Sequence, residues 1–322
     1  MRKIRWGILG TADIAWGQTI PGMKLAEHCE RYAIAGRRIE KAKKYQEEFG
    51  FAKAYGSYDE LLADTEVEAV YIPLPNDLHC EWTIKALKAK KHVLCEKPLA
   101  VSEAQVTEMF RTAEENGVLL MEAFAYLHSP FIQAVKAEID AGTIGEVRYL
   151  ESAFLTERRP DTDIRLRKET YGGAFYDLGC YPLSLALWML GKEPDTVRAA
   201  AQFSERKIDL FTSALLLYNS GTVVKVDCGM LLPAGRKDRL HIHGTGGEIE
   251  SFTEFNQCGE TSYTVTRNGR KETKTFTAPN NYALETEQLS RCILYGDKPH
   301  ISSEFSLMTA RVTDRILREI GY

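Results

Sequence analysis

The chain has 322 residues, enough for about two domains, and its 44% hydrophobic composition can supply two ordinary cores. Lys and Arg total 41 against 45 Asp and Glu, so we expect no nucleic-acid partner and no binding to an anionic membrane surface. Seven scattered cysteines without a C-x-x-C pair argue against a disulfide framework and a zinc site, and favour a cytoplasmic protein with reduced thiols. Gly7, Gly10 and Asp13 break the first apolar stretch, which therefore does not resemble a signal peptide, and no run approaches the ~20 apolar residues of a membrane span.

The first part of the chain alternates short apolar runs with charged amphipathic segments. Strands are predicted at residues 4–9, 32–35, 69–72, 92–95 and 118–121. Helices are predicted from residue 10 to an interruption at Pro21, and at 39–49, 77–90 and 102–116. This alternation predicts an α/β domain with a doubly wound, mainly parallel sheet over residues 1–123.

The remainder, residues 124–322, has a different pattern. Helices are predicted near 130–141 and 174–190, and a strand at 146–154. Short runs at 199–203, 210–217, 222–228, 240–243 and 248–252, separated by turn residues, indicate an antiparallel meander. Helices at 282–294 and 305–319 close the chain, so this part is predicted to be an α+β domain with a large open, mainly antiparallel sheet.

The turn after the first strand carries an imperfect glycine motif. The usual G-x-G-x-x-G appears as Gly10-x-Ala12-x-x-Ala15, with a methyl group where backbone normally approaches a pyrophosphate. Backbone N–H groups and the helix dipole of such a turn hold phosphate. The alternative is an ordinary tight turn from strand to helix.

The residues after the second strand bear on the choice of cofactor. An acidic residue there binds the ribose 2′-hydroxyl of NAD, whereas arginine accommodates the 2′-phosphate of NADP. This chain has Gly36-Arg37-Arg38 and no carboxylate, which favours NADP over NAD. The alternative is that one or both arginines solvate the start of the next helix.

The fourth predicted strand ends in Pro73-Leu74-Pro75-Asn76. Asn76 is a candidate helix cap or a candidate ligand, and it places His79 in the first helical turn. His79 is either a neighbour of the nicotinamide or a residue packed against the adjacent loop.

Glu96-Lys97-Pro98 follows the next apolar strand. Ligands of open α/β sheets bind outside the carboxyl ends of the strands, so Lys97 is placed where cofactor and substrate would meet. Hydroxyl oxidation needs a base while hydride leaves for nicotinamide, and a desolvated lysine can serve as that base. The alternative is that Lys97 pairs with Glu96 or Glu122.

Asp177 and Tyr181 are spaced i and i+4 on a predicted helix and therefore share a face. The aspartate can orient a proton-transfer group, and the phenol can donate to a developing alkoxide. The alternative is a helix-start aspartate and a core tyrosine. Arg165 is a candidate for contact with substrate hydroxyls, or a member of a surface ion pair.

His241 and His243 alternate on one predicted strand and point to one face. Two histidines without a nearby carboxylate or thiol pattern more often pack or face solvent on a sheet. We therefore expect no metal site in this protein.

Six segments together resemble the family of glucose–fructose oxidoreductase, inositol dehydrogenase and MocA. They are GILGTA at 7–12, YIPLPN with His79 at 71–79, EKP at 96–98, MEAF at 121–124, DIRL at 163–166 and GGAFYDLGCY at 172–181. The last three look like the branch of dimeric dihydrodiol dehydrogenases and D-xylose dehydrogenases. Two departures from the family pattern are Tyr171, where many relatives have a third glycine, and Leu127-His128, where an arginine often follows MEAF.

The resemblance implies a Rossmann domain that binds NAD or NADP, and a second domain whose open sheet mediates homodimer or homotetramer contacts. It implies a sugar, cyclitol or trans-diol as the small-molecule substrate. Lys97 matches the family lysine, and Asp177 and Tyr181 match its second-domain pair.

The candidate site residues form three groups. The catalytic candidates are Lys97, Asp177 and Tyr181. The cofactor candidates are Gly10, Thr11, Ala12, Asp13, Ile14, Arg37, Arg38, Pro73, Leu74, Asn76, His79, Glu96 and Lys97, and the substrate candidates are Lys97, Tyr126, Arg165, Asp177 and Tyr181. The hypothesis is an NAD(P)-dependent oxidoreductase; the alternatives are an NADPH-dependent ketosugar or dicarbonyl reductase and a non-catalytic dinucleotide sensor.

Overall fold

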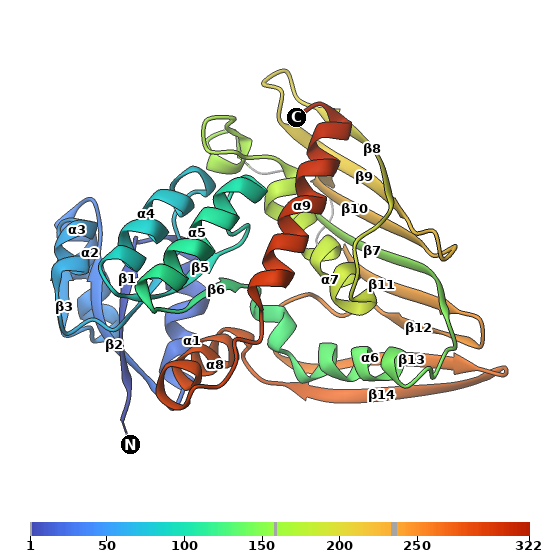
Figure 1. Cartoon of the computed structure of the whole chain (residues 1–322), viewed down its shortest axis with the longest axis horizontal. Coiled ribbons are helices and arrows are strands. Elements are labelled where there is room, and N and C mark those ends of the chain that lie inside the picture. The colour runs from blue at the N-terminus through green and yellow to red at the C-terminus, as the bar shows by residue number, and fades with distance from the viewer. Residues whose placement is uncertain (1, 158–159, 233–236) are drawn as a thin grey trace. The chain divides into compact units, whose positions relative to one another are not determined.

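A six-stranded parallel sheet organises the first part of the computed structural model, which describes residues 2–157, 160–232 and 237–322 (Figure 1). The strand order is β3-β2-β1-β4-β5-β6. The strands are β1 (Ile4–Leu9), β2 (Cys29–Ala35), β3 (Lys53–Tyr55), β4 (Ala69–Ile72), β5 (His92–Glu96) and β6 (Leu120–Ala123). The predicted doubly wound sheet is confirmed, and its order reverses between β1 and β4, which is where ligands bind in this architecture.

Helices accompany this sheet, and local residues determine where they begin and end. They are η1 (Ala15–Thr19), α1 (Ile20–Leu25), α2 (Ile39–Phe49), α3 (Tyr58–Ala63), α4 (Asn76–Lys88), α5 (Glu103–Asn116), η2 (Ala125–His128) and α8 (Asn281–Tyr295). For α5, the Ser102 hydroxyl accepts the Gln105 N–H at the start, and Gly117 ends the helix at φ 65°. Neither β3 nor α3 was predicted, because both are very short.

The first helix differs from its prediction, because Pro21 does not interrupt it. The five residues of η1 form a π-helical turn, in which the Ile20 N–H bonds to the Ala15 carbonyl. Pro21 then occupies the first turn of α1, where a missing N–H is tolerated. The wider turn therefore lets the helix continue through the proline to Leu25.

The chain divides into two units that are not consecutive in sequence. The first unit comprises Met1–His128 and Asn280–Leu307, and the second comprises Ser129–Pro279 and Met308–Tyr322. The predicted boundary after residue 123 assigned residues 280–307 to the second domain, whereas the structure groups them with the first. The reason is packing, because α8 lies against α1 and also contacts β1 and β5.

An eight-stranded sheet forms the second unit, in the order β14-β13-β12-β11-β7-β10-β9-β8. The strands are β7 (Val147–Glu157), β8 (Thr196–Phe203), β9 (Asp209–Leu217), β10 (Val223–Leu232), β11 (Lys237–Gly244), β12 (Gly247–Ser251), β13 (Gly259–Arg267) and β14 (Arg270–Ala278). The predicted mainly antiparallel sheet is confirmed. The simple meander is interrupted, since β7 inserts between β10 and β11 and pairs with β10 in parallel.

Strands β13 and β14 were not predicted, although their turn carries a strong hairpin signal. Asn268 and Gly269 connect them, both at positive φ (52° and 71°). That conformation is the one for which Asn-Gly is favoured in two-residue hairpins.

Helices cover one face of the second sheet, and its residues alternate accordingly. Along β10, Val224, Val226 and Cys228 are fully buried on this face, and Lys225, which alternates with them, is partly exposed on the other. The helices of this unit are α6 (Pro130–Asp140), η3 (Ile164–Leu166), η4 (Phe175–Gly179), α7 (Cys180–Leu190) and most of α9 (Ser303–Ile320). Figure 1 shows no helix on the opposite face of the part of this sheet that the structure describes.

None of the helices in the described residues is both long and apolar enough to cross a membrane.

Candidate active site

Gly10 ends β1 in a conformation that few other residues adopt, at φ +130°. A Cβ at this position would lie 3.0 Å from Leu74 Cδ2 and 3.8 Å from Pro73 Cγ. The loops that follow β1 and β4 are therefore in contact at the carboxyl edge of the sheet, as a dinucleotide cradle requires.

The rest of the turn is held by α2. The Thr11 carbonyl accepts from Lys41 Nζ at 2.6 Å, and the Ala12 carbonyl accepts from the Tyr45 hydroxyl at 3.2 Å. Asp13 and Ile14 then begin the helix. The cofactor candidates from Gly10 to Ile14 thus form one continuous anchored turn.

The predicted phosphate residues Arg37 and Arg38 lie just beyond β2 and are exposed. Arg38 is the N-cap of α2. Lys41, in the first turn of α2, adds a third cation that was not predicted from the sequence. It could have been recognised from its position one helical turn beyond the arginine pair. These residues suit an adenosine 2′-phosphate, which would be bound by forked guanidinium contacts.

His79 joins two loops of the site. Its Nδ1 lies 2.8 Å from the Pro98 carbonyl oxygen and its Nε2 lies 2.7 Å from the Leu74 carbonyl oxygen. The side chain is completely buried, and burial lowers its pKa. His79 therefore packs against both neighbouring loops, and Asn76 is the first residue of α4, with Pro75 as the N-cap.

Lys97 follows β5 in a partly buried position, with its loop fixed on both sides. Two residues after Lys97, the backbone N–H of Leu99 donates to Glu122 Oε1 at 2.9 Å. Burial raises the pKa of Glu122 to about 7, and the positive charge of Lys97 acts to lower the pKa of both Glu122 and His79. Lys97 thus lies close to a carboxyl group that titrates near neutrality.

A buried line of oxygen atoms lies beside Glu96. Thr19 Oγ1 donates to the Tyr71 hydroxyl at 2.9 Å, and that hydroxyl donates to Glu96 Oε1 at 2.5 Å. Glu285 on α8 is completely buried, and neither of its carboxyl oxygens has a hydrogen-bond partner among the described residues. Burial and then the charge of Glu96 raise the pKa of Glu285 well above its ordinary value, which favours its neutral form.

The second unit brings two further candidates, Arg165 and Asp177, together. Arg165 Nε lies 3.0 Å from Asp177 Oδ1, and Asp163 Oδ1 accepts the Arg165 N–H at 2.9 Å. The charge of Asp177 raises the pKa of Arg165. Asp177 is therefore held by a guanidinium rather than merely placed at a helix start.

Buried Asp209 positions η4, the element that carries Asp177. Its Oδ2 accepts the Phe175 N–H at 2.8 Å and the Thr212 hydroxyl at 2.7 Å. Gly173 has φ +118°, and a Cβ there would collide with Asp209 Oδ1. A Cβ at Gly172 would lie 2.3 Å from the Arg165 carbonyl oxygen, so neither glycine of the pair has room for a side chain.

Tyr181 lies in the first turn of α7, four residues after Asp177, and is partly exposed. Its ring packs against Phe154 and Phe255 at centroid distances of 5.1 and 5.3 Å. These contacts fix the ring plane. Tyr126, a predicted substrate residue, belongs instead to the core of the first unit, with no exposed surface.

Comparison with known proteins identifies the family. The model of an oxidoreductase family with an NAD-binding Rossmann fold matches residues 4–124, and the GFO/IDH/MocA C-terminal domain matches residues 132–250. The D-xylose 1-dehydrogenase (NADP(+)) 2 of Haloferax volcanii is 37% identical over 97% of this chain and 95% of its own length.

The chain belongs to the GFO/IDH/MocA oxidoreductase family.

Two further family members support the predicted branch and fold. The trans-1,2-dihydrobenzene-1,2-diol dehydrogenase of Xenopus tropicalis is 30% identical over 98% of each chain. The crystal structure of KijD10, a 3-ketoreductase from Actinomadura kijaniata in complex with NADP and TDP-benzene, superposes with a TM-score of 0.93 at 33% identity, covering 99% of this chain and 98% of that one. The predicted family is confirmed, and solved structures of KijD10 include forms with a lysine or a tyrosine replaced.

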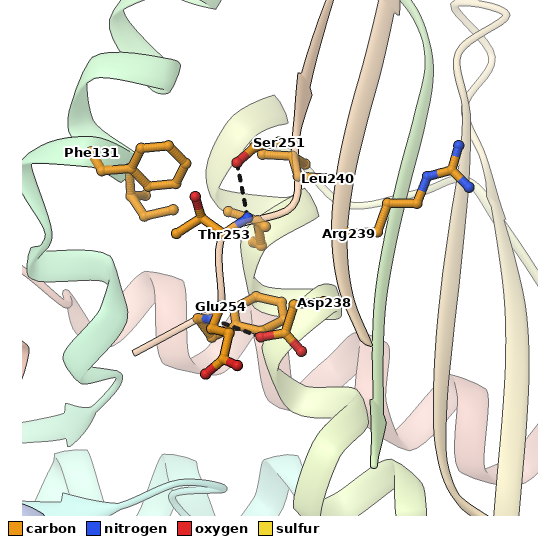
Figure 2. Close-up of a pocket in the computed structure, with 10 residues that line it drawn as sticks. Phe131, Asp238, Arg239, Leu240, Ser251, Thr253 and Glu254 are labelled. Carbon is orange, nitrogen blue, oxygen red and sulfur yellow. Dashed lines mark hydrogen bonds between the residues drawn. The ribbon is translucent and has the colours of Figure 1, made fainter. Parts of the chain in front are cut away.

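A small pocket lies in the second unit, between Phe131 on α6, residues 238–240, Ser251 and residues 253–255 (Figure 2). Its volume of about 20 Å³ is enough for roughly one water molecule. It contains none of the predicted site residues.

Glu285 is the buried site residue that the sequence argument missed. A signal was present, since Tyr282, Glu285, Thr286 and Leu289 have the i, i+3, i+4, i+7 spacing of a buried helix face. A carboxylate at an otherwise apolar position of such a face indicates a buried acid.

Proposed function

We propose that this family member is an NADP-preferring oxidoreductase that acts on a hydroxyl or carbonyl group of a sugar, cyclitol or trans-diol, with Lys97 and Tyr181 in proton transfer and Asp177 in support. The observation that carries the proposal is the setting of Lys97 at the carboxyl end of β5, partly buried and in a loop anchored by His79 and Glu122. An amine held in this way is a general acid or base of fixed position. The NADP-bound KijD10 reductase and the NADP(+)-dependent xylose dehydrogenase support the cofactor preference.

The residues of the first unit fit the dinucleotide. The left-handed Gly10 leaves the backbone open to a pyrophosphate, and Arg37, Arg38 and Lys41 suit the 2′-phosphate. NADP, when bound, supplies the nicotinamide that accepts or returns hydride. The protein's own contribution is to hold the dinucleotide and to move the hydroxyl proton.

Lys97 takes the proton from the substrate hydroxyl in oxidation and returns it in reduction. Burial raises the pKa of Glu122 to about 7, so near neutral pH it places less negative charge beside the amine than an ordinary carboxylate would. In the second unit, Arg165 holds Asp177, and the aromatic contacts of Tyr181 hold its phenol as a hydrogen-bond donor to the substrate oxygen.

The first experiment tests purified full-length protein with NADP and NAD against a panel of aldoses, inositols and trans-diols. We expect saturable, NADP-preferring turnover. In Lys97→Met, kcat should fall about 10²- to 10⁴-fold while cofactor affinity is retained. The matched control is Lys88→Met, because Lys88 is exposed at the end of α4. The proposal is overturned if the native protein shows no turnover and no saturable cofactor binding.

Reduction is the second candidate, since several relatives are named dTDP-3,4-didehydro-2,6-dideoxy-alpha-D-glucose 3-reductase. The same side chains serve both directions, so NADPH is tested with ketosugars, dicarbonyls and nucleotide-linked ketosugars. A higher kcat/KM in this direction favours the reductase. A protein that binds cofactor equally well with and without Lys97, and turns over neither panel, is a dinucleotide sensor.

The second-unit sheet is the surface we propose for homo-oligomer contacts. Leu215 on β9 is exposed on the face opposite α6 and α7, whereas its neighbours Ala214 and Leu216 are buried on the helix-covered face. Light scattering coupled to size-exclusion chromatography should give a dimer or tetramer. Leu215→Glu should then shift the mass toward the monomer, and a monomeric native protein would contradict the assignment.

A further inference from the structure

Two histidines and one glutamate meet on the hairpin formed by β11 and β12. Cross-strand pairing sets His243 opposite Glu248, and His241 and His243 are two residues apart on one strand. His241 Nε2 lies 3.0 Å from Glu248 Oε2, and His243 Nδ1 lies 3.3 Å from the same oxygen. The two imidazole rings have a centroid separation of 4.0 Å. Three metal-ligand side chains therefore converge at one point.

Residue alternation places this cluster on the face of the sheet away from α6 and α7. Figure 2 shows Arg239 pointing to the opposite side of β11 from Asp238 and Leu240, which line the pocket. His241 and His243 follow Arg239 with a period of two and share its side. Their side chains are 16% and 43% exposed in the single chain, so an ion and a coordinating water can reach them. The contact surface proposed around Leu215 lies on β9, which β7 and β10 separate from β11.

The spacing suits a zinc-type ion. Zinc binds imidazole nitrogen and carboxylate oxygen at about 2.0–2.2 Å, so neighbouring ligands of a tetrahedral site are roughly 3.4 Å apart. The two nitrogen-to-oxygen distances, 3.0 and 3.3 Å, are close to that value. All three ligand atoms lie within 4.8 Å of one another. Rotation of the more exposed His243 ring can bring them to the distances of a coordinated set.

The charges around the cluster also favour a cation. Glu250 on β12 pairs with His241 on one side, and Glu151 on β7 pairs with His241 on the other. Glu151 is matched by Arg239 at 3.3 Å. The carboxylates of Glu248 and Glu250 therefore leave this group of side chains with a net negative charge.

A second such group, Glu27, His28 and Glu287, does not offer comparable ligands. His28 Nδ1 lies 2.5 Å from Glu287 Oε1, and His28 Nε2 lies 2.8 Å from the Tyr295 hydroxyl. Both ring nitrogens are thus engaged, and the side chain is only 5% exposed. This cluster is a satisfied hydrogen-bond network.

We propose that His241 Nε2, His243 Nδ1 and the Glu248 carboxylate bind one Zn²⁺ or similar borderline divalent ion, with water completing the coordination. The ion would tie β11 to β12 on the helix-free face. The sequence predicted no carboxylate near the two histidines, whereas the hairpin register places Glu248 of the partner strand beside both. This inference is independent of the proposed reaction.

Isothermal titration of zinc chloride into chelator-treated, tag-free full-length protein tests the site. We expect one saturable equivalent in the native protein. Replacing a residue that only hydrogen-bonds to a metal ligand costs about 10- to 100-fold in metal affinity. Loss of a ligand itself in His241→Asn, His243→Asn or Glu248→Gln should therefore weaken zinc binding at least about tenfold. Glu250→Gln is the matched control, because it removes the neighbouring charge and keeps the ligand set.

Two further measurements separate folding from binding. Circular dichroism checks that each variant retains the native fold, and cobalt titration reports tetrahedral coordination by its visible absorption. Zinc should raise the unfolding temperature of the native protein and of Glu250→Gln, but not that of His243→Asn. The proposal is overturned if the native protein shows no saturable binding, or if the three ligand variants bind zinc as tightly as the native protein.

Discussion

Glu122 provides the sharpest test of the electrostatics around Lys97. Its side chain is almost completely buried, Oε1 accepts the Leu99 N–H, and Oε2 makes no hydrogen bond of good geometry in the described residues. Burial raises the pKa from 4.5 to about 7. Replacing Glu122 with Gln preserves the shape and the acceptor for Leu99 while removing the titration.

The direction in which stability changes with pH follows from proton binding to Glu122. Between pH 4.5 and about 7 the unfolded chain releases the Glu122 proton while the folded protein keeps it. The free energy of unfolding therefore decreases as pH rises through this window, and the contribution is fully present only below pH 4.5. A difference of about 2.5 in pKa, at roughly 1.36 kcal/mol per pKa unit, corresponds to a change of about 3 kcal/mol in the free energy of unfolding.

Urea unfolding of native protein and Glu122→Gln at several pH values measures this effect. Trp6, Trp16 and Trp82 lie in the first unit, so tryptophan fluorescence reports chiefly on that unit. The stability of Glu122→Gln relative to the native protein should increase by about 3 kcal/mol between pH 4.5 and 8. Glu114→Gln, an exposed change on α5, is the control and should follow the native curve. A difference between Glu122→Gln and native that does not vary with pH would refute the assignment of a near-neutral carboxyl.

Three other substitutions have definite expected outcomes. Glu285→Met removes two unpartnered buried oxygens and should raise the free energy of unfolding by about 1–3 kcal/mol; a lower unfolding temperature of the variant would show instead that Glu285 makes a stabilising bond. Gly173→Ala adds a Cβ against Asp209 at positive φ and should destabilise by about 2 kcal/mol or more, whereas unchanged unfolding would contradict the contact. Replacing Arg37 and Arg38 with Ala should raise KM for NADP about 10- to 100-fold and leave KM for NAD nearly constant; equal effects on both cofactors would contradict the assignment of these arginines to the 2′-phosphate.

Sequence patterns were sufficient for features that depend on neighbouring residues. Apolar runs and their stop signals predicted most strands and helices, the ends of α2 and α5 at glycine among them. The position of Lys97 followed from its place directly after a buried strand, because parallel strands end at a common edge. The motifs from Gly10 to Tyr181 were specific enough to indicate the family, which the comparisons confirm.

Tertiary structure alone decided the features that join distant segments. The insertion of β7 between β10 and β11, the return of α8 to the first sheet, and the approach of Glu285 to Glu96 each link residues many positions apart. Local periodicity carries no information on which apolar faces will pair, because that choice depends on how well whole surfaces pack together. The convergence of Glu248 on His241 shows the same principle over a shorter distance, since the register of the hairpin sets which side chains meet.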